Sequence, residues 1–175
     1  MNAKKLVFID ETSTKTNMTR LRGRSRRGRR LIDKTSHGHW KTSTFIAALR
    51  HDRLTASFTI DGAINGEIFL TYVRRVLAPT PRRGDTVTMD NLAAHKVPGI
   101  REAIEAVGAR VAYIPSYSPD LNPIEMLFSK IKSILRKKAL RTVDALWKEL
   151  GEITTCVSPT ECRNYLRHAG YFQSG

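Results

Sequence analysis

Short apolar runs and periodic apolar positions divide the chain into predicted strands and helices. The first run, KLVFID at residues 5–10, is apolar at nearly every position and ends in an acid, a pattern that predicts a buried central strand. Further strands are predicted at about residues 40–50, 54–60, 85–90 and 110–114. Apolar residues at helical spacing predict helices at residues 66–77, from Pro98, from Pro123, at 142–155 and from Ser158.

The order of these elements predicts the fold class. Three strands follow one another and two strand–helix–strand crossovers come after them, so we expect an α/β fold with a mixed five-stranded sheet covered by helices. The polar, arginine-rich residues 12–39 are expected to form a long loop or an irregular hairpin. A chain of 175 residues can build one compact domain with its own core, and we expect residues 1–175 to form a single domain.

A strong positive charge favours a polyanionic partner. The formal net charge is +14 and the pI is about 10.3, a balance typical of proteins that bind nucleic acid. The first 50 residues hold 13 Lys and Arg against 3 Asp and Glu. We expect the arginines of RLRGRSRRGRR to contact DNA phosphates, although a solvated basic loop would have the same composition. These arginines are Arg20, Arg22, Arg24, Arg26, Arg27, Arg29 and Arg30.

Several functional classes lack support in the sequence. No apolar run approaches the roughly 18 residues of a membrane span, and the first residues lack the apolar core of a signal peptide, so we expect a cytoplasmic protein. The phosphate-binding motifs G-x-x-x-x-G-K-[ST] and G-x-G-x-x-G are missing, which leaves ATP and dinucleotide chemistry without support. Cys156 and Cys162 form no C-x-x-C pair, so reduced thiols are expected rather than a zinc site. His37 and His39 are interpreted as surface-loop residues.

Three acids at the ends of predicted core elements are candidates for a metal site. Asp10 and Asp90 end strands, and Glu125 lies in the first turn of the helix that starts at Pro123. Ligands of α/β sheets gather at the carboxyl ends of strands, and carboxylate oxygens suit Mg²⁺ or Mn²⁺. Two such ions, about 3.5–4 Å apart, can assist both the attacking and the leaving oxygen at a phosphodiester.

Each acid also has a structural interpretation. Asp10 alone could be a strand-end aspartate, and its neighbour Glu11 should point to the opposite face of the sheet. Asn122, Pro123 and Glu125 have the spacing of N-cap, N1 and N3 residues, so a capping role explains Glu125 about as readily as a ligand role. Turn roles are favoured for Asp61 and Asp120.

Five segments together resemble the catalytic domain of bacterial insertion-sequence transposases of the mariner superfamily. They are VFIDETS, TRLRGRSRRGRR, HGHWKTSTFIAAL, MDNLAAHK and YSPDLNPIEMLFSKIK, and the resemblance runs from about Lys4 to Tyr171. It implies a ribonuclease H-like fold and a DDE triad of Asp10, Asp90 and Glu125, with 34 residues between the second and third acids. It also implies two Mg²⁺ or Mn²⁺ ions, hydrolysis at the transposon ends, and attack of the freed 3′-hydroxyl on target DNA.

The resemblance leaves parts of the function open. Asn91 and His95 follow the second acid and are candidates for supporting the metal ligands, for contacting DNA or for packing the loop. Transposases of this kind usually carry a helix-turn-helix region, which we expect upstream or on a separate chain, and we expect a homodimer on DNA. Besides a DDE transposase, we consider a stand-alone ribonuclease H-like nuclease and a catalytically silent DNA-binding remnant.

Overall fold

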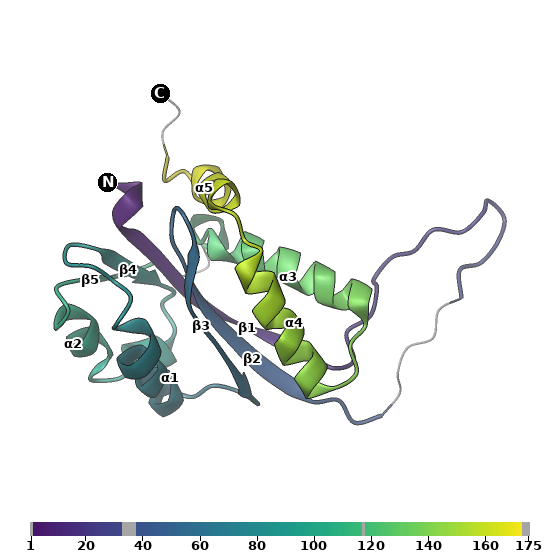
Figure 1. Ribbon diagram of the computed structural model, residues 1–175, viewed down its shortest axis with the longest axis horizontal. Helices are drawn as coiled ribbons and strands as arrows, with labels where there is room; N and C mark the ends of the chain where they lie inside the picture. The colour runs from purple at the N-terminus through teal and green to yellow at the C-terminus, as the bar shows by residue number, and fades with distance from the viewer. Residues whose placement is uncertain (1, 33–37, 117, 173–175) are drawn as a thin grey trace.

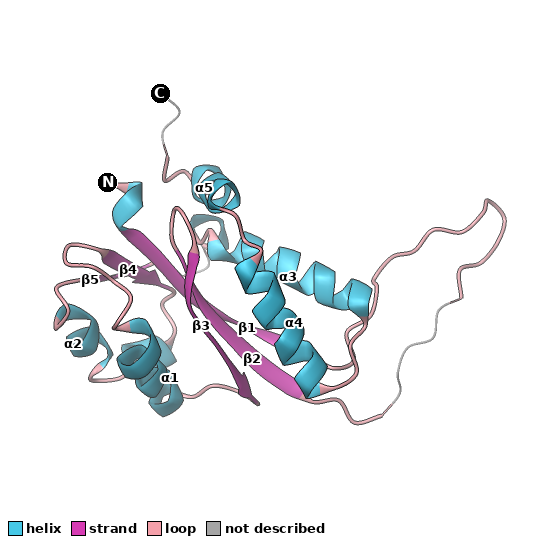
Figure 2. Cartoon of the chain, viewed as in Figure 1, coloured by secondary structure: helices cyan, strands magenta, loops and turns pink. Residues whose placement is uncertain are grey.

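A mixed sheet forms the centre of the protein (Figures 1 and 2). The computed structural model describes residues 2–32, 38–116 and 118–172. The strands are β1 (Leu6–Lys15), β2 (Thr42–Leu49), β3 (Leu54–Asp61), β4 (Thr86–Met89) and β5 (Arg110–Tyr113). The helices are α1 (Gly66–Tyr72), α2 (Ile100–Glu105), α3 (Ile124–Lys138), α4 (Val143–Thr155) and α5 (Pro159–His168). Shorter turns of helix are η1 (Ala3–Lys5), η2 (Val73–Leu77), η3 (Ala93–Lys96) and η4 (Pro119–Leu121).

The five strands are ordered β3-β2-β1-β4-β5, with β1 in the middle. β2 runs antiparallel to β1 and β3, whereas β1, β4 and β5 run parallel to one another. The chain crosses over through α1 between β3 and β4 and through α2 between β4 and β5. The predicted mixed five-stranded α/β sheet is therefore confirmed. Because three strands are parallel, their carboxyl ends lie at the same edge of the sheet.

β1 is longer than the strand predicted at residues 5–10, because its second half pairs with β2. Thr12 and Thr14 are buried in this pairing. Threonine is polar but β-branched, and it fits a pleated, partly buried surface. Of the loop or irregular hairpin predicted at residues 12–39, the first four residues are strand and pair antiparallel with β2, so the boundary of the predicted strand is too early. Residues 33–37 of that prediction lie outside the described part of the chain.

Helices cover both faces of the sheet (Figure 1). One core lies against α3, α4 and α5 and includes Phe8 of β1. The other lies against α1, η2 and α2 and includes Val7 and Ile9. Successive strand residues point to opposite faces, so a central strand that is buried on both sides needs an apolar residue at every position. The uninterrupted run LVFI follows from this arrangement.

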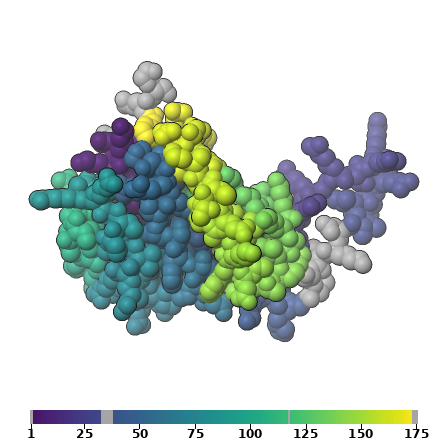
Figure 3. Space-filling view, in the orientation of Figure 1, coloured from purple at the N-terminus to yellow at the C-terminus, as the bar shows by residue number. Residues whose placement is uncertain are grey.

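The arginine-rich segment projects from the body of the protein after β1 (Figures 1 and 3). Residues 20–32 are exposed throughout, and even the apolar side chains Leu21 and Ile32 have exposed fractions of 76% and 82%. The segment therefore presents its guanidinium groups to solvent instead of packing on the core. Among the described helices, none is long and apolar enough to cross a membrane.

Candidate active site

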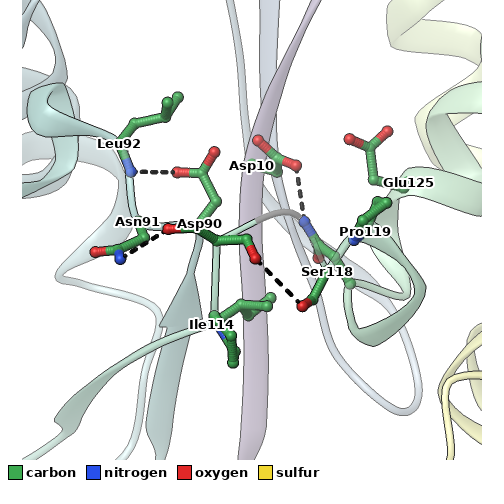
Figure 4. A pocket seen from close by; sticks show the side chains of 11 residues that line it. Asp10, Asp90, Asn91, Leu92, Ile114, Ser118, Pro119 and Glu125 are labelled. Carbon is green, nitrogen blue, oxygen red and sulfur yellow. Dashed lines mark hydrogen bonds between the residues drawn. The ribbon is translucent and has the colours of Figure 1, made fainter.

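Three carboxylates from different elements line one pocket (Figure 4). Asp10 lies within β1, Asp90 directly follows β4, and Glu125 lies in the first turn of α3. The pocket has a volume of about 360 Å³, and the loop that follows β5 forms part of its wall. The structure thus brings together the three acids that the sequence singles out, at the edge where the parallel strands end.

Asp10 is the most enclosed of the three acids. Its exposed fraction is 6%, and it accepts hydrogen bonds from the Glu11 backbone N–H at Oδ1 and from Asn122 Nδ2 at Oδ2, both at 2.8 Å. Burial raises the pKa of Asp10 to about 7, the Glu11 amide opposes this rise, and the charges of Glu11, Glu125 and Asp90 add to it. The carboxylate form of Asp10 is therefore held in an environment that disfavours negative charge.

Asn122 is a pocket residue that the sequence interpretation missed. The prediction of Asn122 as a side-chain N-cap is wrong, because the cap position of α3 is Pro123 and, among the described residues, no side chain caps this end. Asn122 is instead buried and donates to Asp10, a contact between residues 112 positions apart. Glu125 lies exposed one turn further along, so its predicted part in a capping box is wrong as well. A local Asn-Pro-x-Glu pattern marks the helix start correctly but cannot reveal a distant partner.

Asp90 makes its contacts at a single oxygen. Asp90 Oδ1 accepts a hydrogen bond from the Leu92 backbone N–H at 3.2 Å (Figure 4), and His95 Nδ1 lies 2.5 Å from the same oxygen. The His95 contact is close but poorly aligned for a hydrogen bond. Burial opposes ionisation of Asp90, but the contacts with His95 and Leu92 lower its pKa.

Glu11 reaches the same site through His95. His95 Nε2 lies 2.9 Å from Glu11 Oε2, so the buried imidazole contacts one carboxylate at each nitrogen. Burial disfavours the imidazolium, but the contacts with Asp90 and Glu11 raise the pKa of His95 to about 10. Glu11 does point away from the pocket that contains Asp10, as strand alternation predicts. Strand alternation could not indicate that His95 would contact both Glu11 and Asp90.

The remaining candidates lie apart from this pocket or at its margin. Asn91 lines the pocket and donates to Ser116 Oγ at 3.2 Å. Asp61 ends β3 and is exposed, next to a glycine with positive φ. Asp120 is exposed in η4, and His39 is exposed in a loop. Cys156 and Cys162 are free thiols. His37 lies outside the described residues.

The first arginines of the projecting segment lie beside the end of α3. A second pocket is lined by Arg20, Leu21 and Arg22 from the segment and by Ser133, Arg136 and Lys137 from α3. Four of these six residues are cationic, so the surface between the segment and the helix is strongly positive. The same helix begins at the acidic pocket and ends at this basic one.

The acidic pocket offers oxygen donors, the type of ligand that suits Mg²⁺ or Mn²⁺. Three carboxylates line it, and within the described chain the buried Oδ1 of Asn122 has no hydrogen-bond partner. Hard oxygen donors of this type are the ligands that both ions prefer. In the described residues, no three His, Cys, Asp or Glu side chains lie close enough together to hold an ion as they stand. Carboxylates repel one another without a cation, so ion binding would have to draw them together.

The sheet order and the helices on both faces are those of a ribonuclease H-like fold. The chain belongs to the DDE superfamily endonucleases, whose sequence profile matches residues 5–147. No curated protein sequence matches the chain.

Solved structures of Mos1 transposase have the same fold. The Mos1 paired-end complex with left transposon end matches with a TM-score of 0.76 and 15% identity, over 98% of this chain and 57% of that chain. The catalytic domain of Mos1 mariner transposase matches with a TM-score of 0.70 and 14% identity, over 97% of this chain and 85% of that chain. This chain therefore spans a little over half of the Mos1 chain in the paired-end complex. At such identities the likeness establishes the fold.

Proposed function

We propose that the protein is the catalytic domain of a transposase that cuts DNA at transposon ends and joins the freed 3′-hydroxyl to target DNA. The observation that carries this proposal is the convergence of Asp10, Asp90 and Glu125 on one pocket. Membership of the DDE superfamily endonucleases supports it, as does the likeness to Mos1 complexes with a transposon end and after strand transfer. A bacterial insertion sequence, and thus the bacterial cytoplasm, is the proposed setting.

In this proposal the three acids hold two Mg²⁺ or Mn²⁺ ions, the metals present in solved Mos1 complexes. When bound, such ions polarise the scissile phosphate and activate a water or a 3′-hydroxyl for in-line attack. The chain itself supplies the carboxylates that bind the ions, and neighbouring groups hold these carboxylates in place. Asn122 holds one oxygen of Asp10, and His95 and Leu92 hold one oxygen of Asp90. No nucleophilic Ser or Tyr is required, because water and DNA hydroxyls are the attacking groups.

DNA contact is assigned to the arginines at residues 20–30 and to the basic end of α3. Arginine can make bidentate contacts with phosphate, and these contacts are largely independent of sequence. Recognition of particular transposon ends is therefore assigned to a helix-turn-helix part upstream or on a separate chain. Since transposition must bring two ends together, we propose that the protein acts as a homodimer on DNA.

Strand transfer of a pre-cleaved end tests this function. An oligonucleotide that carries the element end with a free 3′-hydroxyl is incubated with plasmid DNA and Mn²⁺, because a pre-cleaved end reduces the need for end recognition. The wild type is compared with Glu125→Gln and with Asp120→Asn, which removes an acid from the neighbouring turn outside the pocket. We expect joined product with the wild type and Asp120→Asn, and none with Glu125→Gln.

The other outcomes separate the alternatives. Joining by Glu125→Gln at the wild-type rate would remove Glu125 from the mechanism. Metal-dependent nicking without joined product would favour a stand-alone nuclease. Salt-sensitive DNA binding by a folded protein, with neither nicking nor joining even when the helix-turn-helix part is supplied, would favour a catalytically silent remnant.

A further inference from the structure

A buried imidazole links the central strand to the loop that carries Asp90. His95 has an exposed fraction of 0%, and its ring packs on Phe69 with 4.2 Å between ring centroids. The Tyr113 hydroxyl donates to the His95 carbonyl oxygen at 3.2 Å, which ties the backbone of η3 to β5. The ring is therefore fixed from several sides, with one nitrogen toward Glu11 and the other toward Asp90.

We propose that Glu11 and His95 are positioning residues that orient the Asp90 carboxylate for metal binding. The proposal rests on the proposed function, because it takes Asp90 as a metal ligand. In metal sites a ligand is commonly held by a partner that does not touch the ion, and loss of such a partner costs about 10–100-fold in affinity or activity. Glu11 would act on Asp90 only through the imidazole.

Asp90 needs such support more than Asp10 does. Asp10 lies within β1, is paired with Ala47 of β2 and accepts two hydrogen bonds of 2.8 Å. Asp90 lies beyond the last paired residue of β4, and 34% of its side chain is exposed. Its two contacts, with Leu92 and His95, both use Oδ1. Oδ2 is thereby left available to the pocket, and Figure 4 shows this oxygen turned away from Leu92.

A purely structural role for His95 leaves one contact unexplained. A buried histidine needs partners for its polar atoms, and Glu11 provides one for Nε2 while the packing on Phe69 fixes the ring. The other nitrogen, Nδ1, lies against an acid of the pocket, and packing alone does not explain why that neighbour is Asp90. Glu11 and Asp10 are also neighbours on β1, so one short piece of the central strand sets the position of Asp10 directly and that of Asp90 through His95.

The test measures Mn²⁺ binding and the imidazole signal in matched variants. Free Mn²⁺ is counted by electron paramagnetic resonance with the pre-cleaved end oligonucleotide present. Glu11→Gln keeps the size of the side chain but removes its charge, and Glu11→Asp keeps the charge on a shorter side chain. Tyr113→Phe is the control, because it loosens the same loop without touching either carboxylate. In each variant the imidazole N–H resonances of His95 are recorded by ¹H–¹⁵N correlation spectroscopy.

We expect Glu11→Gln to weaken Mn²⁺ binding by about 10–100-fold. It should also shift the imidazole N–H resonances of His95, because an amide oxygen is a weaker acceptor than a carboxylate. Glu11→Asp should recover part of both, and Tyr113→Phe should bind Mn²⁺ as the wild type does. If the wild type binds Mn²⁺, Glu125→Gln weakens binding and Glu11→Gln does not, the positioning role is wrong while the proposed metal site stands. If the wild type binds no Mn²⁺, or Glu125→Gln binds it equally well, the proposed function fails and the positioning role falls with it.

Discussion

Replacement of Asp10 by asparagine should stabilise the metal-free protein at neutral pH. Asp10 is buried, and its environment raises the pKa of its carboxyl to about 7. In the unfolded chain the same carboxyl ionises near pH 4. Between these two values the folded state must hold a proton that the unfolded state has released, so stability falls as the pH rises toward 7 and the full cost applies above it.

The size of the effect follows from this interval. Each pH unit over which the two states differ by one proton costs about 1.4 kcal/mol, so an interval of about three units amounts to about 4 kcal/mol at most. The substituted asparagine cannot ionise and carries none of this cost. Its amide can still accept from the Glu11 N–H, and Asn122, whose Oδ1 has no partner in the described chain, can turn to accept from the new amide. We therefore expect a gain of about 2–4 kcal/mol in the free energy of unfolding at pH 8.

Asp85 provides the matched control, since it is also a buried aspartate but has a cation beside it. Asp85 Oδ2 lies 2.8 Å from Arg50 Nη1, and the two side chains have exposed fractions of 5% and 6%. Asp85→Asn leaves a buried guanidinium without its counter-charge, a change that typically costs about 3–5 kcal/mol. The same chemical substitution should thus stabilise the protein at position 10 and destabilise it at position 85.

Urea unfolding in EDTA at pH 5 and pH 8 measures both variants. The gain from Asp10→Asn should be small at pH 5 and large at pH 8. Addition of Mg²⁺ at pH 8 should narrow the gap, because an ion that binds only the folded wild type stabilises it. An Asp10→Asn protein that is less stable than the wild type at both pH values would refute the argument, since Asp10 would then contribute a favourable interaction rather than an electrostatic cost.

Three further predictions concern the support of the site, DNA affinity and helix α3. Asn122→Ala removes the donor to Asp10 and should lower strand-transfer activity by about 10–100-fold, measured at a temperature at which the variant is fully folded; equal activity would show that the donor is dispensable. Charge removal at both Arg24 and Arg27 should reduce the slope of log affinity against log salt by about 0.9 for each phosphate that is no longer neutralised, and an unchanged slope would exclude phosphate binding by these two arginines. Ala139 ends α3 with φ of 50°, so Ala139→Gly should raise the unfolding free energy by about 0.5–1 kcal/mol in urea titrations; a drop in stability would contradict this.

The general position of the site could be predicted from the sequence because it depends on local patterns. An apolar run that ends in Asp10 and an alternating run that ends before Asp90 mark two strands, and parallel strands open at the same edge of a sheet. The proline-led start of α3 marks the third element. These signals need no knowledge of which residues touch, and the pocket indeed contains all three acids.

The supporting contacts could not be predicted because they join distant residues. Asn122 has every feature of a helix cap in the sequence, yet its partner Asp10 is 112 positions away. Glu11 is directed to the other side of the sheet by alternation, and only the placement of His95, 84 positions away, connects it to the site. A local pattern reports backbone shape, whereas these hydrogen bonds depend on how the elements pack.

The central strand connects the acidic pocket to the basic segment along the chain. Asp10 lies five residues before the end of β1, and the arginine segment begins a few residues after that end. At about 3.3 Å per residue, the strand covers roughly 17 Å between Asp10 and Lys15. One DNA strand advances about 3.4 Å per nucleotide, so this span corresponds to about five nucleotides. In the proposed function, a duplex that has its scissile phosphate in the pocket and runs along β1 would reach the end of this strand, where the chain leads into the arginine-rich segment, about half a helical turn away.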